Sequence, residues 1–307
     1  MFQFTVKRLL KGLFCVWFIW SLVFCMVRVT GDPTDWMLPD GATEAEMMTL
    51  RTALHLDEPM AKQYTDSLTD LLSCNSGQRY YYKRDVAELY KERMGATLTL
   101  AIPAFTLAIL AGIFLGTVAA IRHDSLIDRI TMSGAIIGYT LPSFCLGIIL
   151  IYIFCLKLRL LPSAGMDSLR NLILPMITLA VSPLATIARF TRSALLDVMN
   201  REYIDGARMK GVSELAVTIR HGIRNSLIPV VTGIGMQLGT IIGGAVVVET
   251  VFSWPGVGML LVTAAKERDF PTVQYGILMV AFSVNLVNIL IDISYGYLDP
   301  RIRETFK

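Results

Sequence analysis

REYIDGARMKGVSELAVTIRHGIRNSLIP, from Arg201 to Pro229, lies between two strongly apolar segments of a 307-residue chain. The stretch carries too many charges to lie in lipid, and it is too short to fold as a domain. Its pattern predicts a helix that ends at Gly211, a second helix that begins at Ser213, and a return to apolar sequence at Pro229. A polar element of this kind indicates a docking surface for a cytoplasmic protein. A loop that lies on lipid headgroups would have the same pattern.

The sequence around this stretch is that of a membrane protein. Hydrophobic residues make up 54% of the chain and charged residues 17%, against about 25% charged in soluble domains. Six apolar segments approach the roughly 20 residues that cross a bilayer as a helix. These are 9–27, 97–121, 130–156, 171–188, 228–251 and 275–297. We therefore expect an all-α polytopic membrane protein with about six transmembrane helices, in which 171–188 is the shortest.

The first apolar segment resembles a secretory signal peptide in part. Lys7, Arg8 and Lys11 precede the apolar run 13–27, as in the basic and apolar regions of such a peptide. The residues that follow, 28–33, offer no pair of small residues for cleavage. An uncleaved membrane anchor is therefore favoured, with a removed peptide as the alternative.

Lysine and arginine in short loops predict the orientation. An even number of spans puts both termini on one side, and basic residues cluster near both ends and in the loops 122–129 and 189–226. Basic residues at 157–170 oppose this assignment, but the balance favours cytoplasmic termini. The expected organisation is 1–30 as cytoplasmic end and first span, 31–95 as extracytoplasmic segment, 96–298 as a five-span core with a loop at 200–229, and 299–307 as cytoplasmic tail.

The extracytoplasmic segment contains one clear helix start. Thr43 and Glu46 have the spacing of a capping box, which predicts a helix that runs to about His55 and ends before Pro59. The segment has too few apolar residues for a core of its own. We expect a tethered cap.

Catalytic and metal-binding patterns are not found in the sequence. Four cysteines lie in apolar spans and Cys74 is alone outside, so no disulfide framework is predicted. The three histidines are too far apart in sequence to indicate a metal site. No glycine is followed by lysine, which excludes a phosphate-binding P-loop. We expect no catalytic residue and no nucleic-acid partner, and ATP that powers any transport must be hydrolysed by another chain.

Small residues recur at every fourth position in two spans. The second span has Ala104, Ala108, Gly112, Gly116 and Ala120, and the fifth has Gly235, Gly239 and Gly243. This spacing lets helix backbones approach closely in lipid. Packing within the chain is one interpretation, and a subunit interface or a moving pathway is the other. The segment 235–244 is the strongest candidate for the second, because its glycines also permit bending.

Two carboxylates lie in or beside the spans. Glu249 ends the fifth span and precedes FSWPGVG at 252–258, and Asp292 shares a helical face with Asn285 and Asn288. An intramembrane carboxylate is a functional candidate because leaving it in hydrocarbon is costly. For Asp292 we favour structural anchoring, with a role in a transport pathway as the alternative.

The polar stretch also carries a recognisable motif. Tyr203 and Ala207 lie on one face of its first helix, and Gly206-Ala207 leaves a shallow patch that another protein can approach. Asp205-Gly206-Ala207, followed after three residues by Gly211, resembles the EAA loop of ABC-transporter permeases. The departures are mild: aspartate replaces glutamate, and Gly206 replaces alanine. The residues expected to couple to an ATPase are Tyr203, Asp205, Gly206, Ala207, Lys210 and Gly211.

Further matches along the chain resemble the peptide and nickel branch of this family. They are Gly31-Asp32-Pro33, Pro59 with Gln63-Tyr64, Ala96-Thr97-Leu98, Leu141-Pro142-Ser143, Arg224 through Pro229, Glu249 through Gly258, Arg268 through Pro271 with Gln274, and Leu298 through Arg303. The segment Ser73–Tyr82 departs from the pattern, since the family usually has Gly-x-Ser after an acidic residue there.

The resemblance implies a type I ABC importer permease fold and the rest of a transporter. The expected partners are a homologous second permease, two ABC ATPase subunits, an extracytoplasmic solute-binding protein and the bilayer of a bacterial cytoplasmic membrane. This chain would bind no cofactor, since ATP and Mg belong to the ATPases. The polar loop would be the coupling helix that drives alternating access, and the cargo would be peptides or nickel, alone or chelated.

Two other classes of protein remain as alternatives. A non-transporting scaffold or receptor subunit would explain a loop that recruits a cytoplasmic partner, but it would not explain the matches at 249–258 and 268–274. An intramembrane enzyme would need paired catalytic groups, which the spans lack.

Overall fold

The computed structural model describes residues 2–29, 43–53, 56–72, 85–267 and 269–298. Within these ranges it is built from helices and contains no β-strand. Several of the sequence predictions fall on positions outside them: Gly31-Asp32-Pro33, His55, the divergent segment Ser73–Tyr82 with Cys74, Arg268 and the tail 299–307.

Five helices of the described part are long and apolar enough to cross a membrane. They are α1 (Phe2–Val29), α5 (Val86–Ile121), α8 (Leu169–Met199), α11 (Arg224–Val251) and α13 (Phe270–Leu298). A bent pair of helices supplies a sixth apolar segment. The expectation of an all-α protein with about six spans is confirmed.

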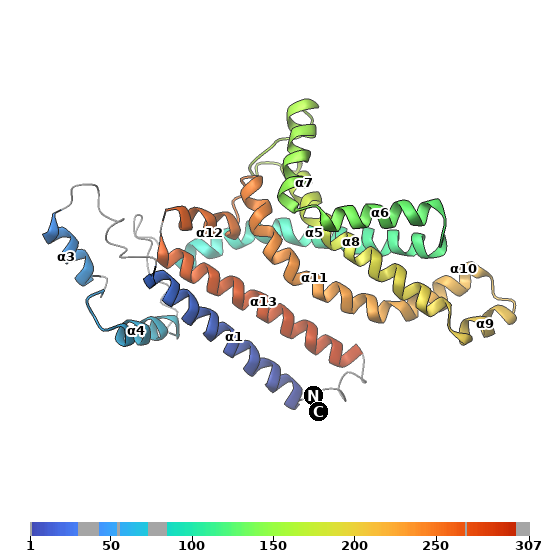
Figure 1. Ribbon diagram of the computed structural model, residues 1–307, viewed down its shortest axis with the longest axis horizontal. Coiled ribbons are helices and arrows are strands. Elements are labelled where there is room, and N and C mark those ends of the chain that lie inside the picture. The colour runs from blue at the N-terminus through green and yellow to red at the C-terminus, as the bar shows by residue number, and fades with distance from the viewer. Residues whose placement is uncertain (1, 30–42, 54–55, 73–84, 268, 299–307) are drawn as a thin grey trace.

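The expectation of one continuous span over 130–156 is wrong. The segment divides into α6 (Leu126–Thr140) and α7 (Ser143–Leu150), which continues as the π-helix η1 (Ile151–Lys157), with a bend of 104° between the halves. Leu141 has the extended conformation at φ −72° and ψ 120°. Pro142 disfavours the helical conformation at the residue before it and lacks an N–H group, which fits the end of α6 at this point. Figure 1 shows α7 standing away from the other helices.

The fourth apolar segment, 171–188, is only part of a 31-residue helix. α8 begins at a capping box of Ser168 and Asn171 and runs to Met199. Arg189 and Arg192 therefore belong to this helix and not to the loop 189–226, which corrects the expected boundary. A hydropathy pattern ends at the first charged residues, whereas a helix continues through them where their side chains reach partners or water.

The core lies where α5 and α8 pack together, with α11 against α8. Leu100, Ala104 and Ala108 of α5 have no exposed surface. At Gly116 an added Cβ would overlap the Ala188 carbonyl oxygen and approach Thr191. The small residues of the second span therefore pack within the chain, which confirms that interpretation for this helix.

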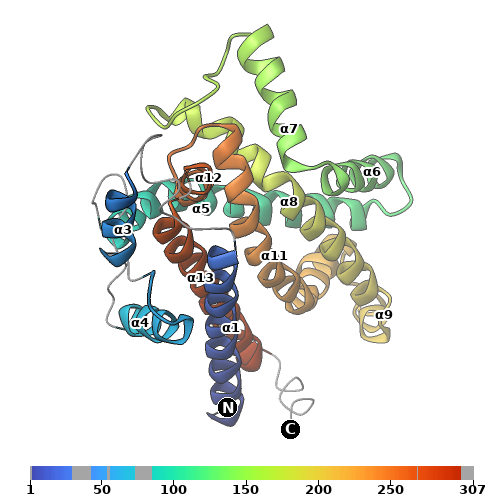
Figure 2. The same ribbon diagram turned by 60° about the vertical axis from the view of Figure 1, so that its left-hand side comes forward.

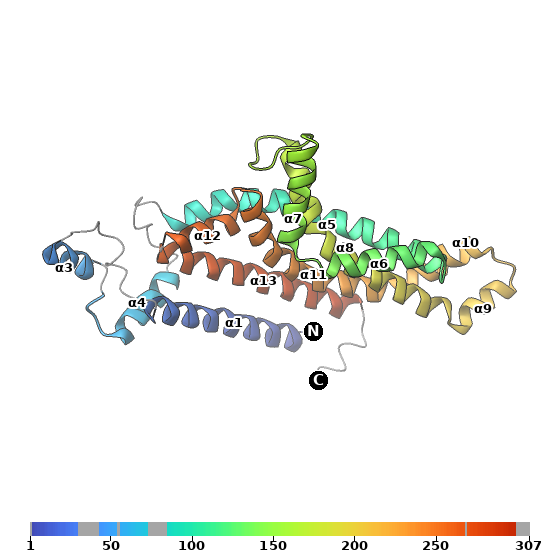
Figure 3. The same ribbon diagram turned by 45° about the horizontal axis from the view of Figure 1, so that its top comes forward.

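α1 packs along α13, and Figures 2 and 3 show the two helices side by side. α4 (Met60–Leu72) contacts the end of α1, where the hydroxyl groups of Ser21 and Tyr64 lie 2.7 Å apart. The Tyr64 ring also meets Phe24 edge-on, with ring centroids 5.3 Å apart. The predicted helix near 43–55 is α3 (Glu44–Ala53), and its capping box is confirmed because Thr43 N donates to Glu46 Oε2 at 2.9 Å.

The remaining helices lie at the two ends of the long axis. α9 (Glu202–Met209), α10 (Glu214–Ala216) and the π-helix η2 (Val217–Ile223) form one end. α12 (Val257–Lys266) lies toward the other end, on the side of α3 and α4 (Figure 1). The predicted docking loop and the turn after Glu249 are thus at opposite ends of the helices. We call them the loop end and the turn end.

Candidate functional site

The polar stretch 201–229 folds as a helix, a turn and a second helix. Gly211 ends the α9 segment at φ +76°, the left-handed conformation that the sequence predicted. Its N–H donates to the Arg208 carbonyl oxygen at 2.9 Å. Ser213 holds the N-cap position of the next helix with extended backbone, but its side chain makes no capping hydrogen bond. The predicted break and restart are confirmed, and the side-chain cap is not formed.

α9 is anchored by one side chain and presents most of its other residues to the outside. Ile204 has no exposed surface, whereas Tyr203 is 49% and Met209 84% exposed. Asp205 and Lys210 are also exposed. Tyr203 and Met209 therefore leave apolar surface on this short helix that a partner protein could cover.

The predicted shallow patch at Gly206-Ala207 is present on this helix. Both residues are half-buried, and a Cβ added to Gly206 would meet no described atom within 4 Å. A glycine inside a helix costs about 1 kcal/mol relative to alanine. Nothing in the described part of this chain requires that glycine, so the open space beside it suits close approach by another molecule.

An ion-pair cluster ties α9 to α10 across the turn. Arg208 Nη1 lies 3.0 Å from Asp205 Oδ1, and Arg208 Nε lies 2.9 Å from Glu214 Oε1. The hydrogen bond with Glu214, followed by that with Asp205, raises the pKa of the Arg208 guanidinium above its usual value. The three side chains are exposed, so the cluster adds little to the free energy of unfolding. Its main effect is to fix how α9 lies relative to α10. The sequence argument named Asp205 but missed its partner.

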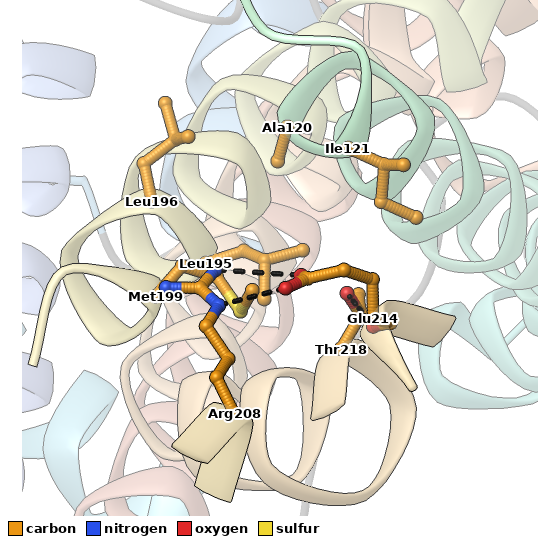
Figure 4. Close-up of a pocket in the computed structure, with 8 residues that line it drawn as sticks. All are labelled: Ala120, Ile121, Leu195, Leu196, Met199, Arg208, Glu214 and Thr218. Carbon is orange, nitrogen blue, oxygen red and sulfur yellow. Dashed lines mark hydrogen bonds and ion pairs between the residues drawn. The ribbon is translucent and has the colours of Figure 1, made fainter. Parts of the chain in front are cut away.

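A cavity of about 460 Å³ separates this cluster from the ends of the long helices (Figure 4). Arg208, Glu214 and Thr218 line one side, and apolar residues of α5 and α8 line the other: Ala120, Ile121, Leu195, Leu196 and Met199. η2 closes against α8, since a Cβ on Gly222 would lie 2.9 Å from Leu195 Cδ1. The loop therefore contacts the end of the bundle through η2, while the cavity lies between the ion-pair cluster and the long helices.

At the turn end, Glu249 is fully buried and forms the centre of a hydrogen-bond network. Thr97 Oγ1 donates to its Oε1 at 2.6 Å, and the N–H groups of Gly258 and Met259 donate to its Oε2 at 2.7 and 3.2 Å. Thr97 Oγ1 in turn accepts from the N–H of Val257 at 2.9 Å. The first three N–H groups of α12 are thus bonded by side chains of α5 and α11.

This arrangement explains the residues of the turn. The N-cap of α12 is Gly256, which has no side chain to cap its own helix. A Cβ at this position would overlap the Glu249 carboxyl group. Trp254 is also buried, and its Nε1 donates to the Ala96 carbonyl oxygen at 2.8 Å. We call Glu249, Thr97 and Trp254 the turn-end staple, because together they fasten α12 to two spans.

The other predicted span residues have mixed surroundings. Gly235 is buried in α11, but a Cβ on Gly239 or Gly243 would meet no described atom within 4 Å. Asn288 is exposed on α13, and position 292 lies on the same helix. The side chain of Asp292 lies outside what the structure describes. Packing within the described chain therefore accounts for Gly235 and leaves Gly239 and Gly243 open.

Sequence reasoning missed one strong ion pair near the loop end. Arg192 of α8 binds Asp128 of α6 through two contacts, Nε to Oδ1 at 2.6 Å and Nη2 to Oδ2 at 2.7 Å. The Asp124 N–H also donates to Asp128 Oδ2, at 3.0 Å. The spacing of Ser125 and Asp128 was an available signal, since the Ser125 side chain caps α6 by accepting from the Asp128 N–H.

One group among the described residues brings carboxylate and histidine ligand atoms together. His123, Asp124 and Asp128 have such atoms within 4.8 Å of one another, although the spacing of the histidines in the sequence does not predict a metal site. Both Asp128 oxygens already accept hydrogen bonds from Arg192. The geometry of this group is that of an ion pair, and we assign it no metal.

The chain is a polytopic α-helical protein, and its fold is that of ABC importer permeases. A solved structure of the MetNI methionine ABC transporter in inward-facing conformations matches with a TM-score of 0.56 and 17% identity, over 69% of this chain and 97% of that one. An amino acid ABC transporter crystallised with histidines matches with a TM-score of 0.54 and 15% identity, over 70% of this chain and 94% of that one. These likenesses establish the fold.

The sequence places the chain within that class. Residues 112–304 match the model of the family described as binding-protein-dependent transport system inner membrane component. The glutathione transport system permease protein GsiC of Escherichia coli K12 is 38% identical over 305 residues, covering 99% of each chain, and the same protein of Shigella dysenteriae gives the same values. The chain belongs to this family and is an inner-membrane permease subunit of an ABC importer, which confirms the resemblance seen in the sequence.

Proposed function

We propose that this chain forms half of the transmembrane pathway of an importer for short peptides, and that α9 is the element through which ATPase subunits drive it. The observation that carries the proposal is the form of α9. One buried side chain anchors the helix, while its remaining face offers Tyr203, Met209 and the open side of Gly206 to a partner. Gly206 and Gly211 are the positions at which an ATPase surface would approach most closely.

The surroundings of α9 support a lever role. Only Asn200 and Arg201 separate it from α8, and the Arg201 N–H donates to the Val198 carbonyl oxygen at 3.1 Å. A connection this short transmits displacement instead of absorbing it. ATP-dependent closure of the partners can shift the spans only through contacts that differ between the two states, and α9 is the surface on which such contacts would form.

The expected remainder of the transporter follows from this arrangement. A homologous second permease completes the pathway, two ABC ATPases bind ATP and Mg, and a solute-binding protein delivers cargo at the turn end. In this orientation both termini lie in the cytoplasm with α9. Gly239 and Gly243, beside which an added Cβ would meet no described atom within 4 Å, would face the second permease or the pathway. Asp292 keeps the role proposed for it, an anchor near the cytoplasmic end.

The cargo proposed is a short peptide, with the tripeptide glutathione as the first candidate. The support is the 38% identity over nearly the full chain to relatives named for glutathione transport. Nickel, alone or as a chelate, was the other cargo indicated by the sequence. The one close group of ligand residues among those described is the Asp128 site, which is already bound by Arg192.

Uptake by intact cells tests this proposal. Cells lacking the gene are complemented with the wild-type chain or with Gly206→Trp, and uptake of labelled glutathione, a labelled dipeptide and labelled nickel is measured. Wild type is expected to restore peptide uptake, and Gly206→Trp to insert normally without restoring it. Gly206→Ala is the matched control, because a methyl group fits the space and favours the helix. Restored nickel uptake alone would refute the peptide cargo. No restored uptake of any solute would favour a non-transporting scaffold.

A further inference from the structure

The ion pair between Arg192 and Asp128 is not part of the short sequence motifs that carried the resemblance to permeases. It joins α8, the helix that leads directly into α9, to the first turn of α6, the helix that leads into the bend at Pro142. The Asp128 side chain is 4% exposed and that of Arg192 24%. A guanidinium that binds a carboxylate through two parallel contacts fixes direction as well as distance. Sliding of one helix past the other would break both contacts.

Asp128 is itself held rigidly. Its carboxylate accepts from the Asp124 N–H, and its own N–H donates to Ser125 Oγ, the N-cap of α6. The Asp128 side chain is therefore tied to the start of its own helix before Arg192 reaches it. A force on Arg192 acts on the backbone of α6 and not on a mobile side chain.

The rest of the interface between α6 and α8 holds no second ion pair among the described residues. A Cβ on Gly138 would lie 2.9 Å from Val181, so the helices approach closely there through small and apolar residues. An apolar cavity of about 330 Å³ lies beside this contact, lined by Gly134, Ala135 and Val181 among others. Farther along, the Arg189 guanidinium lies over the Tyr139 ring at 4.9 Å from its centroid. The Asp128 pair is the strongest directional contact among those described between the two helices.

We propose that Arg192 and Asp128 are positioning residues that couple α6, and with it the bent segment α7, to the movement of α9. The inference rests on the proposed function, since it takes α9 as the site where ATPases act. Displacement of α9 moves α8, and the ion pair then obliges α6 to follow. Because the chain turns by 104° after α6, a shift of α6 along its own axis displaces α7 sideways. Without the pair, α8 would move and α6 would lag.

The test uses the assembled transporter in proteoliposomes and measures cargo moved per ATP hydrolysed. Asp128→Asn keeps the size of the side chain but removes its charge, and Arg192→Gln removes the other partner. Each is expected to leave ATP hydrolysis near the wild-type rate, because α9 is unchanged, while cargo per ATP falls about tenfold. Exchanging the charges, Asp128→Arg with Arg192→Asp, is expected to recover part of the loss. Arg129→Gln, which removes an adjacent exposed charge, is the matched control.

A distance measurement separates coupling from a general loss of packing. Spin labels attached through a genetically encoded keto amino acid replace Leu126 on α6 and Asp197 on α8, both exposed. In the wild-type transporter the distance between them is expected to be the same without nucleotide and in the ATP-bound state. In Asp128→Asn it is expected to change on ATP binding, because α8 moves alone.

The outcomes distinguish this inference from the proposed function. If Asp128→Asn and Arg192→Gln retain the wild-type cargo per ATP and a constant label distance, the coupling role of the pair is wrong. If Gly206→Trp also transports normally, the role of α9 is wrong as well. If the single variants fail to assemble, the charge exchange is measured in their place. An assembled charge-exchange variant that transports cargo while its label distance changes on ATP binding would overturn the inference, because cargo would then move without α6 following α8.

Discussion

Replacing Glu249 with leucine is expected to lower the free energy of unfolding by about 4 kcal/mol. The residue has no exposed surface, and its carboxyl group accepts from Gly258 N, Met259 N and Thr97 Oγ1. Leucine leaves the N–H groups of Gly258 and Met259 without an acceptor, each at a cost of about 2 kcal/mol. The Thr97 hydroxyl adds no such cost, because it can rotate toward another acceptor. Glutamine keeps one carbonyl oxygen for the N–H groups, so Glu249→Gln is expected to cost about 1 kcal/mol.

The free energy of unfolding is measured on the purified chain in mixed micelles. Increasing amounts of sodium dodecyl sulfate unfold the chain, and circular dichroism monitors the loss of helix. Thr250→Ala is the matched control, because Thr250 is the next residue but is exposed, and its hydroxyl bonds only within α11. The control is expected to change stability by less than about 0.5 kcal/mol. A loss below about 1 kcal/mol for Glu249→Leu would refute the reasoning. It would mean that water reaches the start of α12 and replaces the carboxyl group.

Three further variants test other parts of the structure. Gly211→Ala and Gly211→Arg strain the same left-handed backbone by about 1 kcal/mol. Loss of transport in the arginine variant alone would therefore locate a partner at that surface. Equal transport by both variants would argue against a partner there. Gly116→Leu is expected to prevent stable insertion, because the leucine side chain would overlap the Ala188 carbonyl oxygen. Insertion is measured by resistance to protease, and a resistant variant would contradict the packing of α5 on α8. Tyr64→Phe removes the hydroxyl that lies beside the Ser21 hydroxyl, and it is expected to expose α4 to proteolysis while α1 stays intact. Unchanged cleavage would show that the ring contact with Phe24 is enough to hold α4 on α1.

The sequence was sufficient for features set by local chemistry. Apolar length predicted the five long helices that can cross a membrane, because a bilayer fixes how much helix must be buried. A glycine at 211 predicted the break in the polar loop, because it adopts the left-handed conformation at little cost. The capping box at Thr43 and Glu46 was likewise predicted from a spacing of three residues, which a single helical turn brings together.

Features set by distant residues were not predictable in this way. Asp128 and Arg192 are 64 positions apart, and Thr97 and Glu249 are 152 apart, so no periodicity relates them. Glu249 was recognised as a buried carboxylate, but its partners depend on how α5, α11 and α12 pack. The 104° bend after Thr140 followed from Pro142, whose effect on the preceding residue is local but whose consequence for the span is not.

The two ends of the permease have different physical character, which fits their proposed roles. At the turn end, buried hydrogen bonds fix α12 to two spans and leave little freedom. At the loop end, α9 is held by Ile204 and by exposed ion pairs and leaves its outer face open. A lever needs a surface on which force acts and a rigid body that transmits it. The ion pair between Arg192 and Asp128 lies near the loop end, on the helix that leads into α9.

Site-specific photo-cross-linking tests most directly whether α9 is the docking surface of an ATPase. Benzoylphenylalanine replaces Tyr203 in the transporter expressed from its own locus, and Phe114, which is 66% exposed on α5, is the control position. Irradiation is expected to join the ATPase subunit to the chain at position 203 and not at position 114. An assembled, transporting complex that yields no ATPase adduct at position 203 would contradict the account.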